Sequence, residues 1–311
     1  MPRRIEPGRF GPHGLSTPTN VLGQPLIVGR SYALGGALGR VFVEQRLALS
    51  ATAALYGIRG PQATGPLALK VFDLRHTPRR AISQAFALQR RCAGPLVIAA
   101  QVLHIDAGRA YWAMERASGP SLEVHLWRQT AAHSQLPLPT LLQYFATMAY
   151  AVAHCHDRGV VHRDIKPDNF LLATQAPHGL KLADFGLAID LPKAQSVGTT
   201  PYMAPEALRG APAHRAVDVY ALGICLYRMI VGIEPHYDDD EALVAAQILA
   251  QQPSYTVADL RVALGQKTQH PMIVEGVVAL YQAATQWDAR RRPEAAQLAR
   301  AAQRLLMADS L

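Results

Sequence analysis

The 311-residue sequence lacks the features that would assign it to several large classes of protein. Its three cysteines, Cys92, Cys155 and Cys225, are odd in number and far apart, so we expect no disulfide framework and a reduced, cytoplasmic setting. No charge-free apolar run reaches the ~18 residues of a membrane span. No apolar stretch follows the basic N-terminus as it would in a signal peptide. We therefore predict neither a membrane span nor a signal peptide.

Lysine is scarce as well, because only five of the 31 basic side chains are lysines. Abundant arginine and alanine are typical of GC-rich coding sequences, which favours a bacterial source. The net charge of +8 would suit anionic ligands such as nucleotide phosphates. The basic residues are scattered and form no cluster interleaved with aromatics, so we expect no specific nucleic-acid partner.

The first third of the chain reads as β-rich. Residues 1–24 contain many prolines and glycines and are expected to form a flexible tail. Short β-type runs and a single helical pattern then follow, at 25–36, 40–45, 66–74, 78–92 and 101–116, the last range holding two strands across a turn. The stretch 46–65 is a long connection with room for additional structure. These patterns predict five strands and one helix.

The remainder of the chain is dominated by helical patterns. They occur at 139–159, 218–232, 240–252, 273–287 and 293–308. The pattern at 218–232 is apolar nearly all round, which is typical of a buried helix. The chain is therefore predicted to be an α+β domain over residues 25–308, with an N-terminal lobe at 25–116 and a C-terminal lobe at 117–308.

Three polar motifs follow one another in the middle of the chain. VVHRDIKPDNFLL contains Asp164, Lys166 and Asn169, LKLADFGLAI contains Asp184, and GTTPYMAPEAL ends the series. Taken alone, an Asp-x-Lys or Asp-Asn pair is usually a turn or a helix cap. The three motifs in this order are far more specific than any of them alone.

With Lys70 in LALK upstream, these motifs resemble the eukaryotic-like Ser/Thr protein kinase family over roughly residues 26–305. The resemblance implies a bilobal fold, with a small β-rich N-lobe holding one helix and a larger α-rich C-lobe. It also implies that ATP is the phosphate donor and that a protein with Ser or Thr hydroxyls is the acceptor.

The resemblance assigns a role to each polar residue. Asp164 would accept or orient the proton of the substrate hydroxyl, and Lys166 would steady the γ-phosphate. Lys70 would reach the α- and β-phosphates. Asn169 and Asp184 would hold Mg²⁺, or alternatively Mn²⁺, because hard cations prefer oxygen ligands.

The expected adenine contacts come from both lobes: Val41, Ala68, Met114, Glu115, Ala117 and Leu171. Met114 would be the gatekeeper, and Glu115 and Ala117 would offer backbone groups of the hinge. The phosphates would be covered by the stretch 34–39, in which Gly35, Gly36 and Gly39 form a degenerate glycine-rich loop. The first glycine of the family's pattern falls on Leu34 and is therefore absent, unless the neighbouring Gly35 takes its place.

A second departure concerns the helix that should pair with Lys70. The family places a glutamate there, but residues 74–105 contain none, and Gln89 occupies the expected position with Gln84 as the alternative. The resemblance further implies three supporting contacts: Glu206 with Arg292, Asp218 with the backbone of the HRD loop, and Thr199 with Asp164 and Lys166.

These departures leave three hypotheses for function. The first is an active Ser/Thr protein kinase. The second is a pseudokinase that binds nucleotide or a partner with little turnover. The third is an enzyme of the same fold that transfers another group, such as AMP, or phosphorylates a small molecule. Arg163 favours regulation by phosphate on the segment that follows Asp184, with Ser196 or Thr200 as the expected phosphosite.

Overall fold

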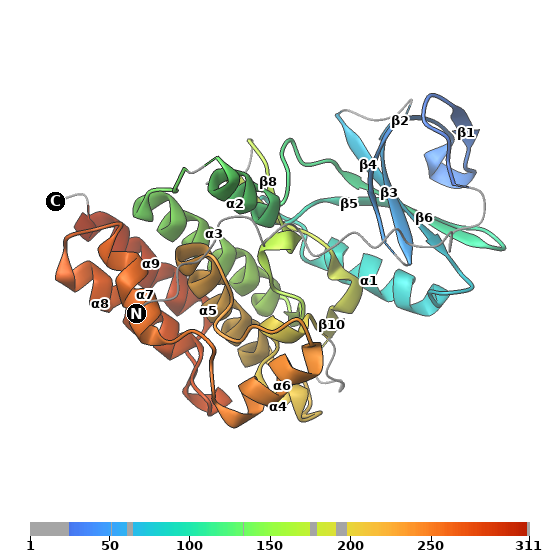
Figure 1. Ribbon diagram of the computed structural model, residues 1–311. Coiled ribbons are helices and arrows are strands. Elements are labelled where there is room, and N and C mark those ends of the chain that lie inside the picture. The colour runs from blue at the N-terminus through green and yellow to red at the C-terminus, as the bar shows by residue number, and fades with distance from the viewer. Residues whose placement is uncertain are drawn as a thin grey trace.

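The structure, a computed structural model shown in Figure 1, describes residues 25–50, 52–60, 65–132, 134–174, 179–190 and 198–309. The strands before residue 116 and α1 (Arg79–Arg91) lie on one side of the molecule, and the helices after residue 120 lie on the other. The predicted two-lobed α+β fold is therefore confirmed. The tail predicted at 1–24 lies outside the described residues.

The described part of the N-terminal lobe contains a sheet of antiparallel neighbours in the order β1-β2-β3-β4-β6-β5. Its strands are β1 (Ser31–Ala33), β2 (Arg40–Leu49), β3 (Ala53–Arg59), β4 (Leu67–Asp73), β5 (Ala100–Ile105) and β6 (Arg109–Glu115). The sheet has six strands, where the sequence patterns predict five. The additional strand is β3, which lies within the connection predicted at 46–65.

The two faces of the sheet bury different side chains. Tyr56 on β3 and Leu69 on β4 belong to a core on one face. Phe72 on β4 belongs to a second cluster, together with Ile82 and Ala85 of α1. Because side chains alternate along a strand, Lys70 shares the face of Phe72. The face that carries Lys70 is thus the one that α1 covers.

The described part of the helical lobe follows the predicted patterns, with three additional helices, one of which is only four residues long. Its helices are α2 (Leu122–Ala131), α3 (Leu138–Asp157), α4 (Pro205–Leu208), α5 (Arg215–Val231), α6 (Glu241–Ala250), α7 (Val257–Gly265), α8 (Pro271–Ala284) and α9 (Ala295–Asp309). The unpredicted α2 and α7 are short and begin at hydroxyl caps. Ser121 accepts from the N–H of Val124, and Thr256 forms a capping box with Asp259.

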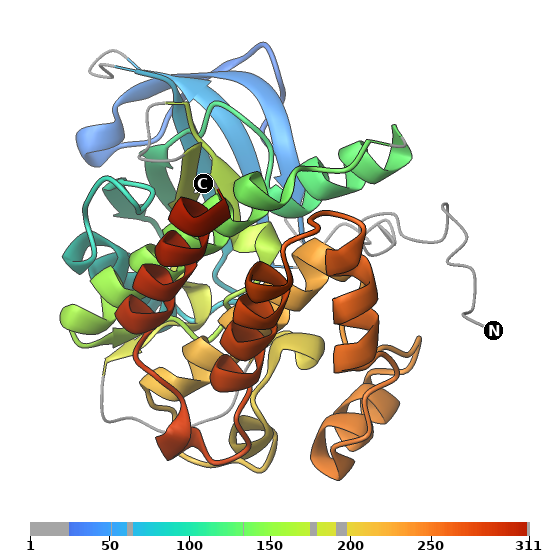
Figure 2. The same ribbon diagram turned by 90° about the vertical axis from the view of Figure 1, so that its left-hand side faces the viewer.

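Helices α3 and α5 form the centre of this lobe, as the apolar pattern at 218–232 predicts. Figure 2 shows the lobe from its outer side, with α9 in dark red at the front and the blue strands above. Close packing needs a small residue at Gly223, where a Cβ atom would lie 2.8 Å from that of Ala284 on α8. No helix in the described parts of the chain is both long enough and apolar enough to cross a membrane.

Four short strands connect these helices and carry the polar motifs. They are β7 (Val160–Val161), β8 (Phe170–Leu172), β9 (Leu180–Leu182) and β10 (Ile189–Asp190). β8 pairs with β9, and β7 pairs with β10, both in the antiparallel sense. The two strand pairs bring the HRD and DFG segments side by side.

An ion pair buried under α4 ties the third motif to the helical lobe. Arg292 donates through both terminal nitrogens to the carboxylate of Glu206, at 2.6 and 2.9 Å. Its side chain is 0% exposed and its guanidinium lies 4.9 Å from the ring centroid of Tyr220. The pairing of Glu206 with Arg292 inferred from the sequence is therefore present.

We expect Arg292→Ala to lower the free energy of unfolding by about 3–5 kcal/mol, because it leaves the carboxylate of Glu206 without its buried partner. Arg290→Ala is the matched control, since Arg290 is 90% exposed in its pair with Asp288. Exposed pairs contribute little, so this variant should stay close to the parent. Urea unfolding of the three proteins measures both effects. Equal losses in the two variants would contradict the role assigned to the buried pair.

Candidate active site

Lys70 and Asp184 meet between the lobes. The Nζ atom of Lys70 on β4 lies 3.0 and 2.9 Å from the two carboxylate oxygens of Asp184. Asp184 has left-handed backbone angles, with φ 56°, and accepts a hydrogen bond from the N–H of Gly186. Desolvation raises the pKa of Asp184, but the Lys70 ammonium and the Gly186 N–H outweigh it. The net pKa is lower than that of an ordinary aspartate.

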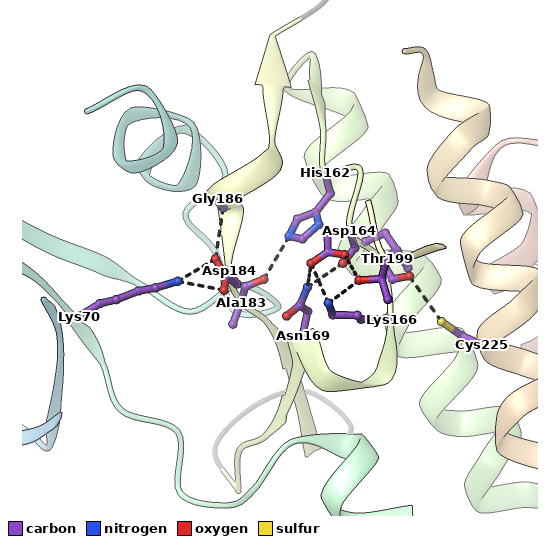
Figure 3. A network of polar contacts seen from close by, with 11 residues as sticks. Lys70, His162, Asp164, Lys166, Asn169, Ala183, Asp184, Gly186, Thr199 and Cys225 are labelled. Atoms are coloured by element: carbon purple, nitrogen blue, oxygen red, sulfur yellow. Dashed lines mark hydrogen bonds and ion pairs between the residues drawn. The ribbon is translucent and has the colours of Figure 1, made fainter. Parts of the chain in front are cut away.

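Asp164 lies at the centre of a second group (Figure 3). The Nδ2 atom of Asn169 donates to its Oδ2 atom at 2.8 Å, and the hydroxyl of Thr199 donates to its Oδ1 atom at 2.8 Å. The Nζ atom of Lys166 lies 3.1 Å from Oδ2 and donates to the Thr199 hydroxyl at 2.6 Å. Three side chains thus fix the direction of one carboxylate.

Asp218, in the first turn of α5, braces the backbone of this loop. Its carboxylate accepts from the N–H groups of His162 and Arg163 at 2.8 and 2.7 Å, and it lies 2.8 Å from the Nε2 atom of His156. The two backbone bonds hold Arg163 at φ 68°, a left-handed conformation that costs free energy for a non-glycine residue. His156 is a member of this group that the sequence did not point to.

The oxygen atoms at the site suit a hard cation. The Nδ2 atom of Asn169 is committed to the carbonyl and carboxylate oxygens of Asp164, so its Oδ1 atom is the group left for a ligand. Asp184 offers a carboxylate nearby, and the carbonyl of the preceding Ala183 accepts a hydrogen bond from His162 Nε2 at 3.1 Å. The described residues contain no cluster of three or more His, Cys, Asp or Glu suited to a metal. Mg²⁺ does not need one, since one or two protein oxygens and phosphates suffice.

Comparison with known families matches residues 53–302 to the protein kinase domain. The chain belongs to the protein kinase family. One relative, calcium/calmodulin-dependent protein kinase type II of Caenorhabditis briggsae, is 44% identical over 110 residues, covering 34% of this chain and 21% of the relative. Another, Aurora/IPL1-related protein kinase 2 of Caenorhabditis elegans, is 32% identical over 177 residues, 56% of each chain. The chain therefore spans from about a fifth to little more than half of these relatives.

The residues predicted to contact adenine come from both lobes. Ala68 on β4 is paired with Met114 on β6, and Leu171 lies on β8 of the helical lobe. The carboxylate of Glu115 lies 2.5 Å from Lys181 on β9, so an ion pair joins the hinge to the helical lobe. The backbone roles of Glu115 and Ala117 toward adenine stay predictions.

The structure contradicts the assignment of the glycine-rich loop. Gly35 and Gly36, at φ 69° and 53°, form a turn against the ring of His104 on β5, 3.1 Å from where their Cβ atoms would lie. Gly39, at φ 58°, ends the same turn. Val41 is 1% exposed in the core on the face opposite Lys70. The glycines reverse the chain between β1 and β2. A chain reversal and a phosphate-binding loop both need glycine at positive φ, so the two look alike in sequence.

The residue that faces Lys70 from the neighbouring strand is Leu55, which the sequence argument missed. The two are directly paired between β3 and β4. A usable signal was the alternation in AALYGIR, where Ala54, Tyr56 and Ile58 are buried on the far face. That alternation places Leu55 on the face of Lys70, where Val41 was expected.

The assignment of Gln89 as the partner of Lys70 is also wrong. Gln89 is 1% exposed, and its amide donates to the carbonyl of Ile98 at 2.7 Å, whereas Lys70 binds Asp184. Leu88 packs in the same core as Phe185, and Gln84 lies one helical turn before Leu88 on the same face. Gln84 is therefore the better candidate for the position of the missing glutamate.

The structure also bears on the predicted phosphosite. The hydroxyl of Thr200 donates to a carboxylate oxygen of Glu241 at 3.3 Å. A phosphate on Thr200 would add negative charge beside that carboxylate and would be repelled. The alternative, Ser196, lies outside the described residues. Arg163 donates through Nε to the carbonyl of Leu187 at 2.5 Å.

We expect Thr199→Val to lower kcat by about 10- to 100-fold, because hydrogen bonds to charged groups are worth about 1.5–3 kcal/mol each. The KM for ATP should change little, since Thr199 contacts Asp164 and Lys166 and not the nucleotide side of the cleft. Thr199→Ser keeps the hydroxyl and should retain most of the turnover. Steady-state kinetics of both variants test this, and parental kcat in Thr199→Val would refute it.

Gln84→Glu should leave turnover unchanged or raise it, because a carboxylate at that position supplies a counter-charge for Lys70. Gln89→Glu should instead lower the free energy of unfolding by about 1–3 kcal/mol or more, because it removes a buried donor to Ile98 and buries a charge. Thermal unfolding and kcat/KM separate the two. A stable Gln89→Glu variant with raised turnover would restore Gln89 as the partner of Lys70.

Proposed function

We propose that the chain is an ATP-dependent Ser/Thr protein kinase that transfers the γ-phosphate of ATP to hydroxyls of a protein substrate. The observation that carries this proposal is the Asp164 carboxylate, oriented by Asn169 and Thr199 with Lys166 beside it. Phosphoryl transfer needs such positioned charges more than covalent chemistry. Membership of the family supports the reaction, and the pairing of Lys166 with Thr199 favours Ser or Thr acceptors.

Each residue then has a distinct task. Asp164 accepts the proton of the attacking hydroxyl, and Lys166, 3.1 Å from it, stabilises negative charge on the transferred group. Lys70 exchanges its contact with Asp184 for the nucleotide phosphates. Asn169 and Asp184 would hold Mg²⁺ or Mn²⁺, which neutralises phosphate charge when bound.

The pseudokinase alternative has one observation in its favour. Lys70 lacks a carboxylate partner on α1, where the described residues include no acidic side chain. The hydrogen bonds that orient Asp164 support turnover, so we expect slowed phosphoryl transfer and not its absence. Transfer of AMP or phosphorylation of a small molecule is less well supported, because the pair of Glu206 and Arg292 anchors the segment expected to bind a peptide.

We infer a kinase domain at residues 25–308, a cytoplasmic location and no specific nucleic-acid partner from the composition and motifs. The relatives named above are animal proteins, so a bacterial source stays a prediction from the arginine and alanine content.

Incubation with γ-³²P-ATP or α-³²P-ATP and a Ser- and Thr-containing protein, with and without Mg²⁺, tests the proposal. Label should transfer from the γ position only and only with the metal. Asp164→Asn and Lys70→Met should reduce transfer by at least about 100-fold, the former with ATP affinity within a few-fold of the parent. Asp157→Asn, at the exposed end of α3, is the matched control. Nucleotide binding without transfer by the parent would establish the pseudokinase alternative.

A further inference from the structure

We propose that the guanidinium of Arg116 stacks on the base of the bound nucleotide, so that a side chain particular to this chain determines its preference for a ligand with an aromatic base. The inference rests on the proposed function, because it takes Mg·ATP as the ligand of the cleft. Arg116 directly follows Glu115, the last residue of β6, and its side chain is 26% exposed.

The side chain of Arg116 lies against Gly57, in the middle of β3. A Cβ atom at Gly57 would lie 2.8 Å from Nη1 and 3.2 Å from Cζ of Arg116, closer than such atoms normally approach. The backbone of Gly57 is not among those with positive φ, so its conformation does not call for glycine. A glycine inside a strand often marks the close approach of another group. Here that group is the guanidinium.

The register of the sheet places this guanidinium on the cleft face. Gly57 pairs with Ala68 on β4, and Ala68 pairs with Met114 on β6. Directly paired residues direct their side chains to the same face. A group that lies where the Cβ atom of Gly57 would be therefore shares the face of the two residues predicted to contact adenine. Lys70, which would bind the phosphates, belongs to the next row along the cleft, where it pairs with Leu55.

Glu44 on β2 holds the guanidinium in this place. The Nη1 atom of Arg116 donates to one carboxylate oxygen of Glu44 at 3.3 Å, and the other oxygen accepts from Nε and Nη2 of Arg59 at 2.9 and 2.6 Å. The N–H of Arg116 donates to the carbonyl of Pro66 at 3.1 Å, which fixes the backbone as well. With Gly57 on one side of it, the guanidinium has the cleft on the other.

A guanidinium in this position suits a flat aromatic ligand. Arginine is planar and stacks on aromatic faces, where a cation is attracted by the electrons of the ring. A lysine ammonium carries the same charge but has no plane to stack. The contact therefore depends on the base and not on the phosphates, which gives it a signature that a general electrostatic attraction would lack.

Calorimetry with Mg·ATP and with Mg·tripolyphosphate, which has no base, tests the proposal. We expect Arg116→Ala to weaken Mg·ATP binding about 3- to 10-fold and to leave the affinity for Mg·tripolyphosphate unchanged. Arg116→Lys should also weaken Mg·ATP binding, because it keeps the charge without the plane. Arg59→Ala is the matched control, since Arg59 binds the same carboxylate of Glu44 but is 74% exposed, and it should bind both ligands as the parent does.

Two results would overturn the assignment. Equal losses for the two ligands in Arg116→Ala would show that the side chain acts on the phosphates through its charge. Tighter binding of Mg·ATP by Arg116→Ala would show that the guanidinium obstructs the cleft.

Gly57→Ala tests the position of the guanidinium without removing it. Its methyl group would displace the Arg116 side chain, so Mg·ATP binding should weaken about 3- to 10-fold with Tm close to the parent. In the Arg116→Ala background the same substitution should cause no further loss, because the two changes remove one contact. Additive losses would show that Gly57 acts independently of Arg116 and would contradict the proposal.

These outcomes are independent of the test of the proposed function, because they are read from binding. If the parent transfers no phosphate but Arg116→Ala loses affinity for Mg·ATP alone, the kinase activity is refuted and the role of Arg116 stands. If phosphate is transferred and Arg116→Ala binds Mg·ATP as the parent does, the role of Arg116 alone is wrong.

Discussion

The carboxylate of Asp218 accepts the backbone N–H groups of His162 and Arg163 from within the first turn of a buried helix. Those two bonds hold Arg163 in a left-handed conformation that it would otherwise leave. The loop that leaves this point carries Asp164, Lys166 and Asn169. The geometry of the reaction centre therefore depends on a charge buried in the helical lobe. Burial raises the pKa of Asp218, but the bonds to His156 and His162 outweigh it and keep the pKa below its usual value.

Lys70 shows how the chain compensates for a missing charge. Without a carboxylate on α1, its ammonium pairs with the residue expected to hold the metal. If Asp184 also held the metal, the same carboxylate would be shared by two cations, and binding of the metal would weaken the hold on Lys70. Phosphates carry enough negative charge to satisfy both. The two lobes are therefore coupled electrostatically through Asp184, even though the usual contact from α1 is absent.

The residues that the sequence predicts to lie together, and that the structure brings together, belong to short motifs whose internal spacing is fixed. Asp164, Lys166 and Asn169 lie within a stretch of six consecutive residues, so their mutual geometry depends on one loop. The structure brings the three side chains together. The roles predicted for the glycine turn and for Gln89 were wrong for two reasons. The position of the turn depends on the register in which the strands pair, and the direction of Gln89 depends on the rotation of α1 about its axis. Residues distant in the sequence determine both. Leu55 faces Lys70 only because β3 pairs with β4 in one register. A positive φ at Gly35 or Gly39 serves a chain reversal as well as a phosphate loop.

The ion pair between Glu115 and Lys181 joins the end of β6 to β9 of the opposite lobe. A second oxygen of Glu115 accepts the N–H of Ala99, so the carboxylate is held from two directions. Opening the lobes at this end would pull the ammonium of Lys181 away from that carboxylate. A second ion pair in the described residues, between Lys70 of β4 and Asp184, also joins the two lobes. The lobes should consequently separate more readily at the Lys70 end, where the ion pair is more exposed than that of Glu115 and Lys181, so that a nucleotide would enter with its adenine foremost and leave with its phosphates foremost.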